Sequence, residues 1–381
     1  MITEIKIKNF KSHKDTDLKL TNLTVLTGIN GSGKSTLIQA LLLLRQSFMK
    51  SRLFDGLDLN NPLCNIGVGN DALYRFAKEG EMSFNLIDEE DKNYLFSFNL
   101  DERSLNDSFL PKKFYSEDVT NDNLIKLALF NNNFQYISAL RWGAKSIFPK
   151  DTYATETQKQ LSLNNGQGEL VAHYLYKFGS TEALDYSKGE LSDLSLMSQT
   201  VYWEQKISPH VTVHVETGKD NNSYAITYGY EGNENQRPIQ ELKAENVGFG
   251  ISYTLPLLVA LLSAKPGSLV IIENPEAHLH PDGQAELAKL ITMVAQNGIQ
   301  VIVETHSDHI ITGTQLACKA YSKGDCFGID KKNVSIYYFS NDLVHNLKID
   351  DLSLEDTGFF VYQPKGFFDR SESDMDKLYG E

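Results

Sequence analysis

The chain has few cysteines and no long apolar segment. These two features argue against a disulfide-rich protein and against a membrane-spanning protein. Its three cysteines, Cys64, Cys318 and Cys326, are widely separated and predict neither a disulfide framework nor a metal-binding pair. The longest apolar run spans Leu255–Leu262, far short of the roughly 18 residues that a membrane-spanning helix needs. Residues 1–8 alternate charged and apolar side chains, unlike a secretory signal. We therefore expect a cytoplasmic protein that does not associate with a membrane.

Positive charge is also in short supply. The chain has 36 lysines and arginines against 50 aspartates and glutamates, which gives a net charge of −14. Such a field repels polyanions on average, and no run of basic residues marks a local groove for a phosphate backbone. DNA is therefore a partner that the charge does not favour. The 41% of hydrophobic residues nevertheless predict a folded globular protein.

The pattern of apolar residues divides the chain into two outer segments and a different middle. The first segment, 1–50, predicts strands around Ile5 and at 23–26, then a helix from Ser35 to about Met49. The middle segment, 51–245, is predicted to be a β-rich insertion with helices near 122–130 and 168–178. Two antiparallel hairpins are expected in it, at 82–100 and 211–228.

The last segment, 246–370, returns to alternating helices and strands, and a polar tail follows at 371–381. Its predicted helices are 252–264, 283–296 and 308–321, and its predicted strands are 269–272 and 299–304. These strands are continuously apolar, which is typical of a parallel sheet covered on both faces. We therefore predict an α/β fold in which the two ends of the chain build one core around the insertion.

Residues 28–35, Gly-Ile-Asn-Gly-Ser-Gly-Lys-Ser, match the P-loop pattern in full. They follow a predicted strand and open a predicted helix, which is the context that the motif requires. The glycines let backbone N–H groups converge on phosphates, Lys34 reaches the β- and γ-phosphates, and Ser35 ligates Mg²⁺. The predicted nucleotide-binding residues are Asn30, Gly31, Ser32, Gly33, Lys34, Ser35 and Thr36.

A carboxylate closes the apolar strand at 268–273. In nucleotide sites an acid at the carboxyl end of a strand holds the water shell of the Mg²⁺ ion. We therefore predict Glu273 for this role, next to Ser35 as the direct metal ligand.

Three strings in the chain resemble ABC-type ATPases of the RecF, SMC and OLD (overcoming lysogenization defect) group. They are the P-loop, Glu-Asn-Pro-Glu-Ala-His-Leu-His-Pro at 273–281, and Glu-Thr-His-Ser at 304–307. Gly-Phe-Phe-Asp at 366–369 and the weaker Tyr-Ile-Ser-Ala-Leu-Arg at 136–141 resemble a bacterial AAA-family branch with a C-terminal domain of unknown function. The resemblance implies a P-loop NTPase fold, the ABC-type ATPase head, that uses ATP and Mg²⁺.

The resemblance also implies roles for particular residues. His306 would contact the γ-phosphate and sense hydrolysis. Residues 246–252 stand where the signature loop of the family lies, so Gly248, Gly250 and Ser252 would cover the ATP of the second subunit in a homodimer. The glycines allow close backbone approach and Ser252 can cap the following helix. A plain helix-capping loop is the alternative interpretation.

The chain departs from that family at one place. ABC ATPases usually carry a water-activating glutamate directly after the metal-associated acid, and here that position is Asn274. A carboxamide can hold a water molecule but cannot accept its proton. Glu276 lies two positions further on, where an extended segment points to the same side. We hypothesise that Glu276 is the base, and the alternative is that it only anchors its loop.

The leading functional hypothesis is an ATP-gated switch that closes as a homodimer and opens on hydrolysis, in a DNA-related or antiphage process. The stretch after His306 is shorter than the nuclease domain of OLD enzymes, so we expect a separate effector, such as a nuclease. One alternative is a nucleotide-clamped scaffold with little hydrolysis, and another is a DNA-end-binding repair ATPase. A metal site at His278, His280, His306 and His309 is a further alternative.

Overall fold

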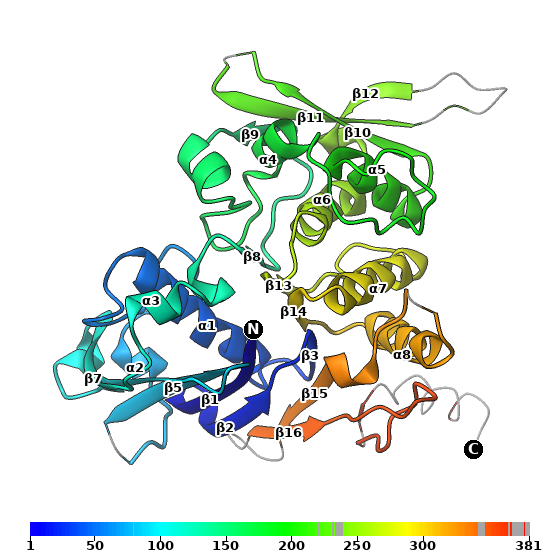
Figure 1. Ribbon diagram of the computed structural model, residues 1–381. Coiled ribbons are helices and arrows are strands. Elements are labelled where there is room, and N and C mark those ends of the chain that lie inside the picture. The colour runs from blue at the N-terminus through cyan, green and yellow to red at the C-terminus, as the bar shows by residue number, and fades with distance from the viewer. Residues whose placement is uncertain are drawn as a thin grey trace.

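The computed structural model describes residues 1–78, 80–219, 221–230, 232, 239–325, 327–341, 347–364, 366–367 and 377 (Figure 1). Within these residues the chain forms three sheets and the helices that cover them. Cys326, residues 368 and 369 of the Gly-Phe-Phe-Asp string, and the predicted tail except residue 377 lie outside the described residues. No helix among the described residues has the length and apolar character that crossing a membrane requires.

A six-stranded, mostly parallel sheet forms the centre of the molecule. Its strands occur in the order β16-β15-β3-β14-β13-β8, and only β16 at the edge is antiparallel. The strands are β3 (Leu23–Gly28), β8 (Phe134–Ile137), β13 (Leu269–Glu273), β14 (Gln300–Glu304), β15 (Val334–Asn341) and β16 (Leu347–Asp351). The predicted parallel sheet, with the two ends of the chain side by side in it, is confirmed.

Alternate residues of these strands enter two different hydrophobic cores. Val270 and Ile272 pack into a core with the helices on one face, whereas Leu269 and Ile271 pack into a core on the other. The helices of the first core are α4 (Val171–Phe178), α5 (Leu196–Ile207), α6 (Phe249–Leu262), α7 (Pro281–Gln296) and α8 (Asp308–Ser322). The second core contains α1 (Lys34–Met49) and an antiparallel sheet. Both faces of the parallel sheet are therefore covered.

The antiparallel sheet next to α1 contains six strands in the order β2-β1-β5-β6-β7-β4. They are β1 (Ile2–Phe10), β2 (His13–Lys19), β4 (Gly56–Asp58), β5 (Glu81–Asp88), β6 (Asn93–Asn99) and β7 (Phe109–Tyr115). The short helices α2 (Gly69–Ala72) and α3 (Asn121–Leu124) lie in the connections. Antiparallel pairing of β5 with β6 confirms the first predicted hairpin.

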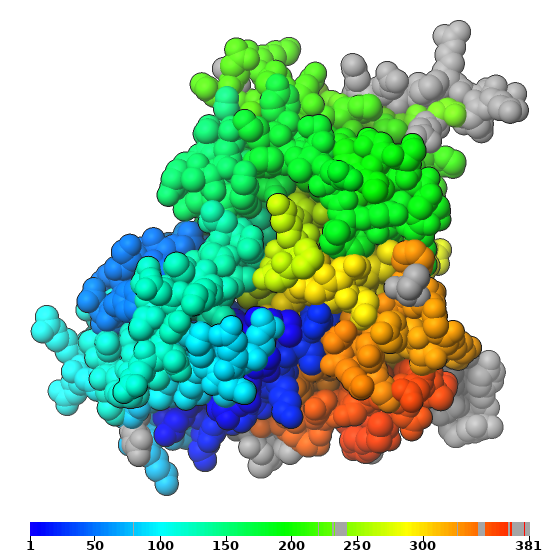
Figure 2. Space-filling model, in the orientation of Figure 1, coloured from blue at the N-terminus to red at the C-terminus, as the bar shows by residue number. Residues whose placement is uncertain are grey.

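A third, smaller sheet contains β9 (Ile147–Pro149), β10 (Val211–Thr217), β11 (Ser223–Tyr230) and β12 (Ile239–Lys243). Antiparallel pairing of β10 with β11 confirms the second predicted hairpin. Figure 2 shows this green part of the chain at the top of the view, above the yellow segment that carries α6 and α7.

The boundaries expected for the insertion differ from the structure in two respects. Strand β8 belongs to the expected insertion but pairs in parallel with β13 of the central sheet. Strand β1 belongs to the expected core but pairs with β5 of the insertion. The N-terminal segment and the first part of the middle therefore share one antiparallel sheet.

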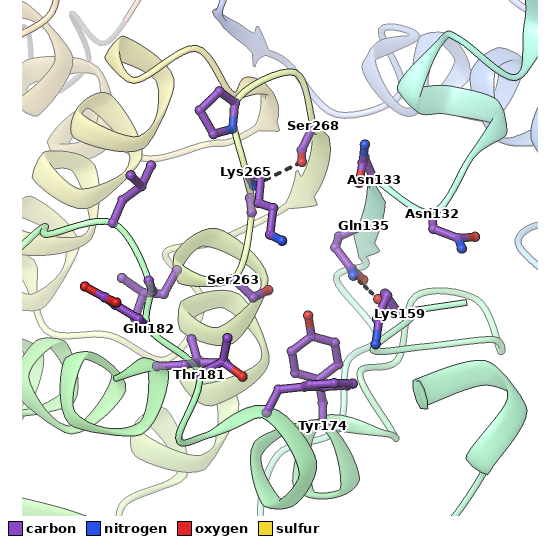
Figure 3. Close-up of a pocket in the computed structure, with 17 residues that line it drawn as sticks. Asn132, Asn133, Gln135, Lys159, Tyr174, Thr181, Glu182, Ser263, Lys265 and Ser268 are labelled. Atoms are coloured by element: carbon purple, nitrogen blue, oxygen red, sulfur yellow. Dashed lines mark hydrogen bonds between the residues drawn. The ribbon is translucent and has the colours of Figure 1, made fainter. Parts of the chain in front are cut away.

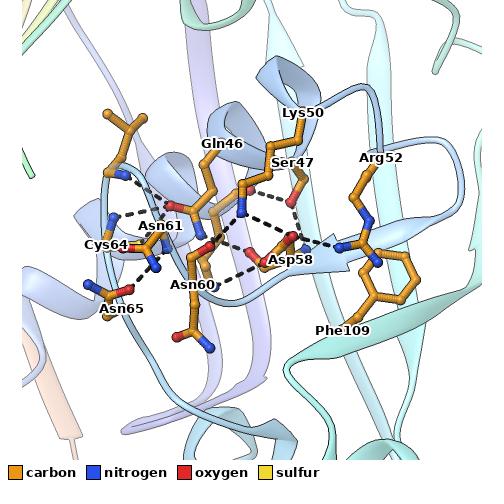
Figure 4. Close-up of polar contacts among 12 residues, drawn as sticks. Gln46, Ser47, Lys50, Arg52, Asp58, Asn60, Asn61, Cys64, Asn65 and Phe109 are labelled. Carbon is orange, nitrogen blue, oxygen red and sulfur yellow. Dashed lines mark hydrogen bonds and ion pairs between the residues drawn. The ribbon is translucent and has the colours of Figure 1, made fainter. Parts of the chain in front are cut away.

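The end of α1 is tied to the antiparallel sheet by a buried glutamine (Figure 4). The amide Nε2 of Gln46 donates to the backbone oxygen of Asp58 at 2.8 Å. Its Oε1 accepts from the backbone N–H groups of Leu63 and Cys64 at 3.2 and 3.1 Å. Further contacts to Asp58 come from Ser47, Lys50 and Arg52. This network fixes the helix that begins at the P-loop.

Replacing Gln46 with Leu should destabilise the fold measurably. Two backbone N–H groups and one carbonyl would lose their partner in a buried place, at about 1–3 kcal/mol each. We expect the free energy of unfolding, measured by urea denaturation, to fall by about 3 kcal/mol or more. Gln39→Leu on the same helix removes one contact, from the Lys11 ammonium, and should cost less than about 1.5 kcal/mol. Equal losses in the two variants would contradict this account.

Candidate nucleotide-binding site

The P-loop lies between β3 and α1, as its motif predicts, and lines a cavity of about 370 Å³ at the carboxyl end of β3. Seven predicted residues line this cavity: Asn30, Gly31, Ser32, Gly33, Lys34, Ser35 and Thr36. Four others line it from different elements: Lys11, Ser12, Glu304 and His306. In parallel sheets this edge is where ligands bind.

Two glycines of the loop have conformations that other residues rarely adopt. Gly28 has a φ of 134°, and a Cβ atom there would lie 2.0 Å from the backbone oxygen of Phe339. Gly33 has a φ of 102° and stands at the N-cap of α1, where no side chain caps the helix. No capping side chain therefore competes with an anion at the start of α1, which is the usual arrangement at phosphate sites.

Lys34 is buried and folds back on the loop. Its Nζ donates to the backbone oxygens of Gly28 and Ile29 at 3.0 and 2.8 Å. Burial lowers the pKa of the Lys34 ammonium, and the nearby carboxylate of Glu304 opposes this shift. Both carbonyl contacts can be exchanged for phosphate oxygens, which are stronger acceptors because they are charged.

Glu304, at the end of β14, contacts the hydroxyl of Ser35. Its Oε1 accepts from the Ser35 Oγ at 2.9 Å, and its Oε2 is buried without a partner. Burial and the charge of Glu273 raise the pKa of Glu304 to about 7. Glu304 ends a predicted strand and opens the Glu-Thr-His-Ser string, but no role in the site is predicted for it from the sequence. Its position two residues before His306 was the available signal.

Glu273 lies one strand further from the P-loop than predicted for a partner of Ser35. Its carboxylate accepts from the hydroxyl of Tyr136 at 3.1 Å and from the backbone N–H of Ala139 at 3.2 Å. Burial raises the pKa of Glu273. Strand β14 lies between β3 and β13, so Glu304 is the carboxylate that reaches Ser35.

The residues around Ser35 fit a Mg²⁺ ion held together with phosphates. Hydroxyl and carboxylate oxygens are hard ligands, and Mg²⁺ is usually bound by one or two carboxylates plus substrate phosphates.

The described residues contain no group of three or more His, Cys, Asp or Glu side chains able to hold a metal ion. The His278 ring packs against Phe249 and Tyr253, with ring centroids 4.6 and 5.0 Å away.

The carboxylate of Glu276 holds the segment that follows β14. One oxygen accepts from the Thr305 hydroxyl and the other from the backbone N–H of His306, both at 2.8 Å. The His306 side chain lines the P-loop cavity, and its pKa is lowered by burial and by the charge of Lys34. Glu276 thus fixes the backbone that carries His306.

Asn274 and Arg141 hold the neighbouring loops together. Asn274 has a φ of 44°, in the left-handed region that asparagine tolerates better than most residues. Arg141 is buried and donates to the backbone oxygens of Asn274 and Glu273, both at 2.9 Å, and of Tyr253 at 3.0 Å. Burial lowers the pKa of the Arg141 guanidinium to about 10. The Tyr-Ile-Ser-Ala-Leu-Arg string therefore links the end of β13 to α6.

The predicted signature residues lie at the start of α6, and none of them lines the P-loop cavity of its own chain. Gly250 packs on the loop after β13, since a Cβ there would lie 2.6 Å from the His278 oxygen. The prediction that Ser252 caps this helix is wrong. Gly248 is the N-cap, and the buried Ser252 hydroxyl donates to the Phe249 oxygen at 3.1 Å. The helix begins at Phe249, before the predicted start at Ser252, because residues 249–251 already have helical backbone conformation.

His13, the first residue of β2, supports the P-loop. Its Nε2 lies 3.0 Å from the Gly33 oxygen and its Nδ1 lies 2.9 Å from the Thr16 hydroxyl. A carbonyl only accepts, so Nε2 carries the proton in the neutral ring. Burial lowers the pKa of His13 to about 4. The imidazole is therefore neutral at physiological pH.

A larger cavity, of about 750 Å³, lies elsewhere (Figure 3). Its lining includes Asn133, directly before β8, and Ser268, directly before β13. These are the amino ends of parallel strands, whereas the P-loop follows the carboxyl end of β3. The two cavities thus lie at opposite edges of the sheet.

Comparisons with known proteins agree with this geometry. A family model described as "AAA domain, putative AbiEii toxin, Type IV TA system" matches residues 23–312. An SMC head bound to the C-winged helix domain of ScpA has a TM-score of 0.55 at 14% identity, covering 93% of this chain and 98% of that one. A Pyrococcus furiosus SMC head with an extended coiled coil, bound to the C-terminal domain of ScpA, has a TM-score of 0.52 at 13% identity, covering 99% of both chains. No curated protein matches. The likeness to SMC heads confirms the predicted ATPase-head fold.

The buried His13 predicts a pH-dependent contribution to stability. Its pKa is about 4 in the fold against 6.5 for the free side chain, so the unfolded chain binds more protons between these values. Stability that is present above about pH 6.5 is lost as the pH falls toward 4, by up to about 1.4 kcal/mol per unit. The difference in unfolding free energy between wild type and His13→Gln should shrink accordingly. Urea denaturation at several pH values measures it, and parallel pH profiles would contradict the assignment.

Proposed function

The chain belongs to the AAA domain family whose model covers residues 23–312, and we propose that it is an ATPase acting as an ATP-gated, dimerising conformational switch. The observation that carries this proposal is the P-loop cavity, where Lys34, Ser35 and His306 meet at the carboxyl ends of β3 and β14. A lysine, a hydroxyl and an uncapped helix N-terminus are the groups that a nucleoside triphosphate needs.

In this proposal, different residues of the cavity bind different parts of Mg²⁺·ATP. The N–H groups at the start of α1 and the ammonium of Lys34 bind the β- and γ-phosphates, and Lys34 gives up its contacts to Gly28 and Ile29. Ser35 and an adjacent carboxylate orient the Mg²⁺ ion, which when bound neutralises phosphate charge. His306 approaches the γ-phosphate from the end of β14. Loss of that phosphate on hydrolysis removes the group that His306 contacts.

Contacts between loops supply a route from the nucleotide to the surface. Glu276 joins the loop after β13 to His306, and Gly250 of α6 packs on the same loop at His278. A shift of His306 on loss of the γ-phosphate therefore acts on the signature segment around Gly248. In the proposed dimer that segment covers the nucleotide of the partner, so ATP stabilises the closed pair and hydrolysis releases it.

We propose the cellular role by analogy, from the descriptions of the matching family and of the similar solved structures. The family description names a toxin of a type IV toxin–antitoxin system, which agrees with an antiphage or DNA-related role of OLD-like character. The SMC heads named above are bound to ScpA, and by the same analogy we propose a separate partner chain, such as a nuclease effector.

A nucleotide-clamped scaffold with little hydrolysis is the second candidate. It is favoured by Asn274, which stands where related ATPases carry the water-activating glutamate, and by Glu276, whose two oxygens are already engaged. In this alternative ATP closes the dimer in the same way, but release depends on the partner chain.

Replacement of Lys34 by Ala tests nucleotide use directly. Removing this cation should lower the phosphate-release rate with Mg²⁺·ATP by about 100-fold or more, and ATP binding measured by calorimetry should weaken. The exposed Lys126 provides a matched control, and Lys126→Ala should stay within about twofold of wild type. ATP binding without any turnover in wild type would favour the scaffold. Absence of both binding and turnover would overturn the proposal.

Glu276 can be tested as anchor or base by a second variant. Thr305→Val deletes the hydroxyl that one Glu276 oxygen accepts from, while it leaves the carboxylate in place. If Glu276 anchors the His306 segment, Glu276→Gln and Thr305→Val should lower turnover to similar extents, within about fivefold of each other. A loss of about 100-fold or more in Glu276→Gln together with wild-type turnover in Thr305→Val would identify Glu276 as the base instead.

A further inference from the structure

One buried carboxylate in the P-loop cavity has a spare oxygen. Glu304 is only 6% exposed, yet it lines the cavity, and its Oε2 has no hydrogen-bond partner. A buried carboxylate oxygen without a partner is costly unless a cation or a donor completes it. Its other oxygen is already held by the Ser35 hydroxyl at 2.9 Å. The unpartnered Oε2 of Glu304 therefore indicates that a ligand binds next to it at the phosphate site.

The strand register explains why this carboxylate and Glu273 differ. Glu304 pairs with Glu273 on one side and with Leu26 of the P-loop strand on the other. Both acids thus stand at the same level of the sheet, but Glu304 is on the strand next to β3. Glu273 has its two oxygens engaged by Tyr136 and Ala139.

We propose that Glu304, rather than Glu273, is the carboxylate that completes the Mg²⁺ shell beside Ser35. This inference rests on the proposed nucleotide binding. The spare Oε2 of Glu304 and the hydroxyl of Ser35 would hold the ion, directly or through its water shell. Glu304 is then a positioning residue for the metal, and Glu273 supports the loop that starts at Ala139.

This role gives opposite effects with and without the metal. Without Mg²⁺, the Glu304 carboxylate repels the phosphates of ATP, so Glu304→Gln should bind a fluorescent ATP analogue as tightly as wild type or more tightly. With Mg²⁺, the variant loses a group that attracts the ion, and the half-saturating Mg²⁺ concentration should rise by about 10-fold or more. A merely structural role would weaken binding in both conditions.

The experiment is a Mg²⁺ titration of fluorescent-ATP binding to the full chain, with Glu273→Gln as the matched comparison. We expect Mg²⁺ to strengthen fluorescent-ATP binding in wild type but not in Glu304→Gln. In Glu273→Gln, the strengthening by Mg²⁺ should stay within about threefold of that in wild type. The reverse pattern, or equal shifts in both variants, would overturn the inference. If wild type binds no nucleotide, the proposed function itself has failed. Should Glu304→Gln not fold, Glu304→Asp against Glu273→Asp decides by the same criterion, because shortening withdraws the carboxylate from Ser35.

Discussion

Parallel pairing of β14 with both β3 and β13 places the groups of the nucleotide site. Lys34 and Ser35 open α1 directly after β3, and Glu304 ends the neighbouring strand. Their proximity is therefore set by ladder hydrogen bonds of the backbone, which are independent of side-chain identity. A slip of β14 by one residue would turn Glu304 to the opposite face of the sheet and bring Val303 to the cavity side. The chemistry at this edge thus depends on the register more than on any single side-chain contact.

A second layer of contacts holds the loops at the same edge. Arg141 is buried, and such a burial is tolerable only because its donors reach four backbone oxygens, on Ser138, Tyr253, Glu273 and Asn274. Glu276 acts in the same way on the segment of His306. Since each anchor joins two elements, the start of α6, the end of β13 and the end of β14 form one hydrogen-bonded unit. In the proposed switch, this unit would transmit the state of a bound nucleotide to α6.

The sequence predicted correctly those features that depend on residues close together in the chain. The glycines and Lys34 of the P-loop, and the alternation in the two hairpins, carry their structure in consecutive residues, and these predictions agree with the fold. Strand β8 was not separable from the insertion because its four residues acquire a role only by pairing with β13. Glu304 was missed for a similar reason, since its contact with Ser35 joins residues 269 positions apart. Ser252 was misplaced because the apolar pattern does not mark the first turn of α6.

The departure at Asn274 and the presence of Glu304 can be understood together. Two consecutive acids at the end of one strand point to opposite faces, so only one of them faces a given side. Here Glu273 and Glu304 occupy paired positions on neighbouring parallel strands, and side chains at paired positions share a face. The sheet edge therefore keeps two carboxylates although position 274 is an asparagine. Asn274 in turn suits its left-handed backbone, and its backbone N–H donates to the backbone oxygen of Glu304 at 2.8 Å. The two carboxylates thus stand side by side on neighbouring strands instead of one after the other on a single strand.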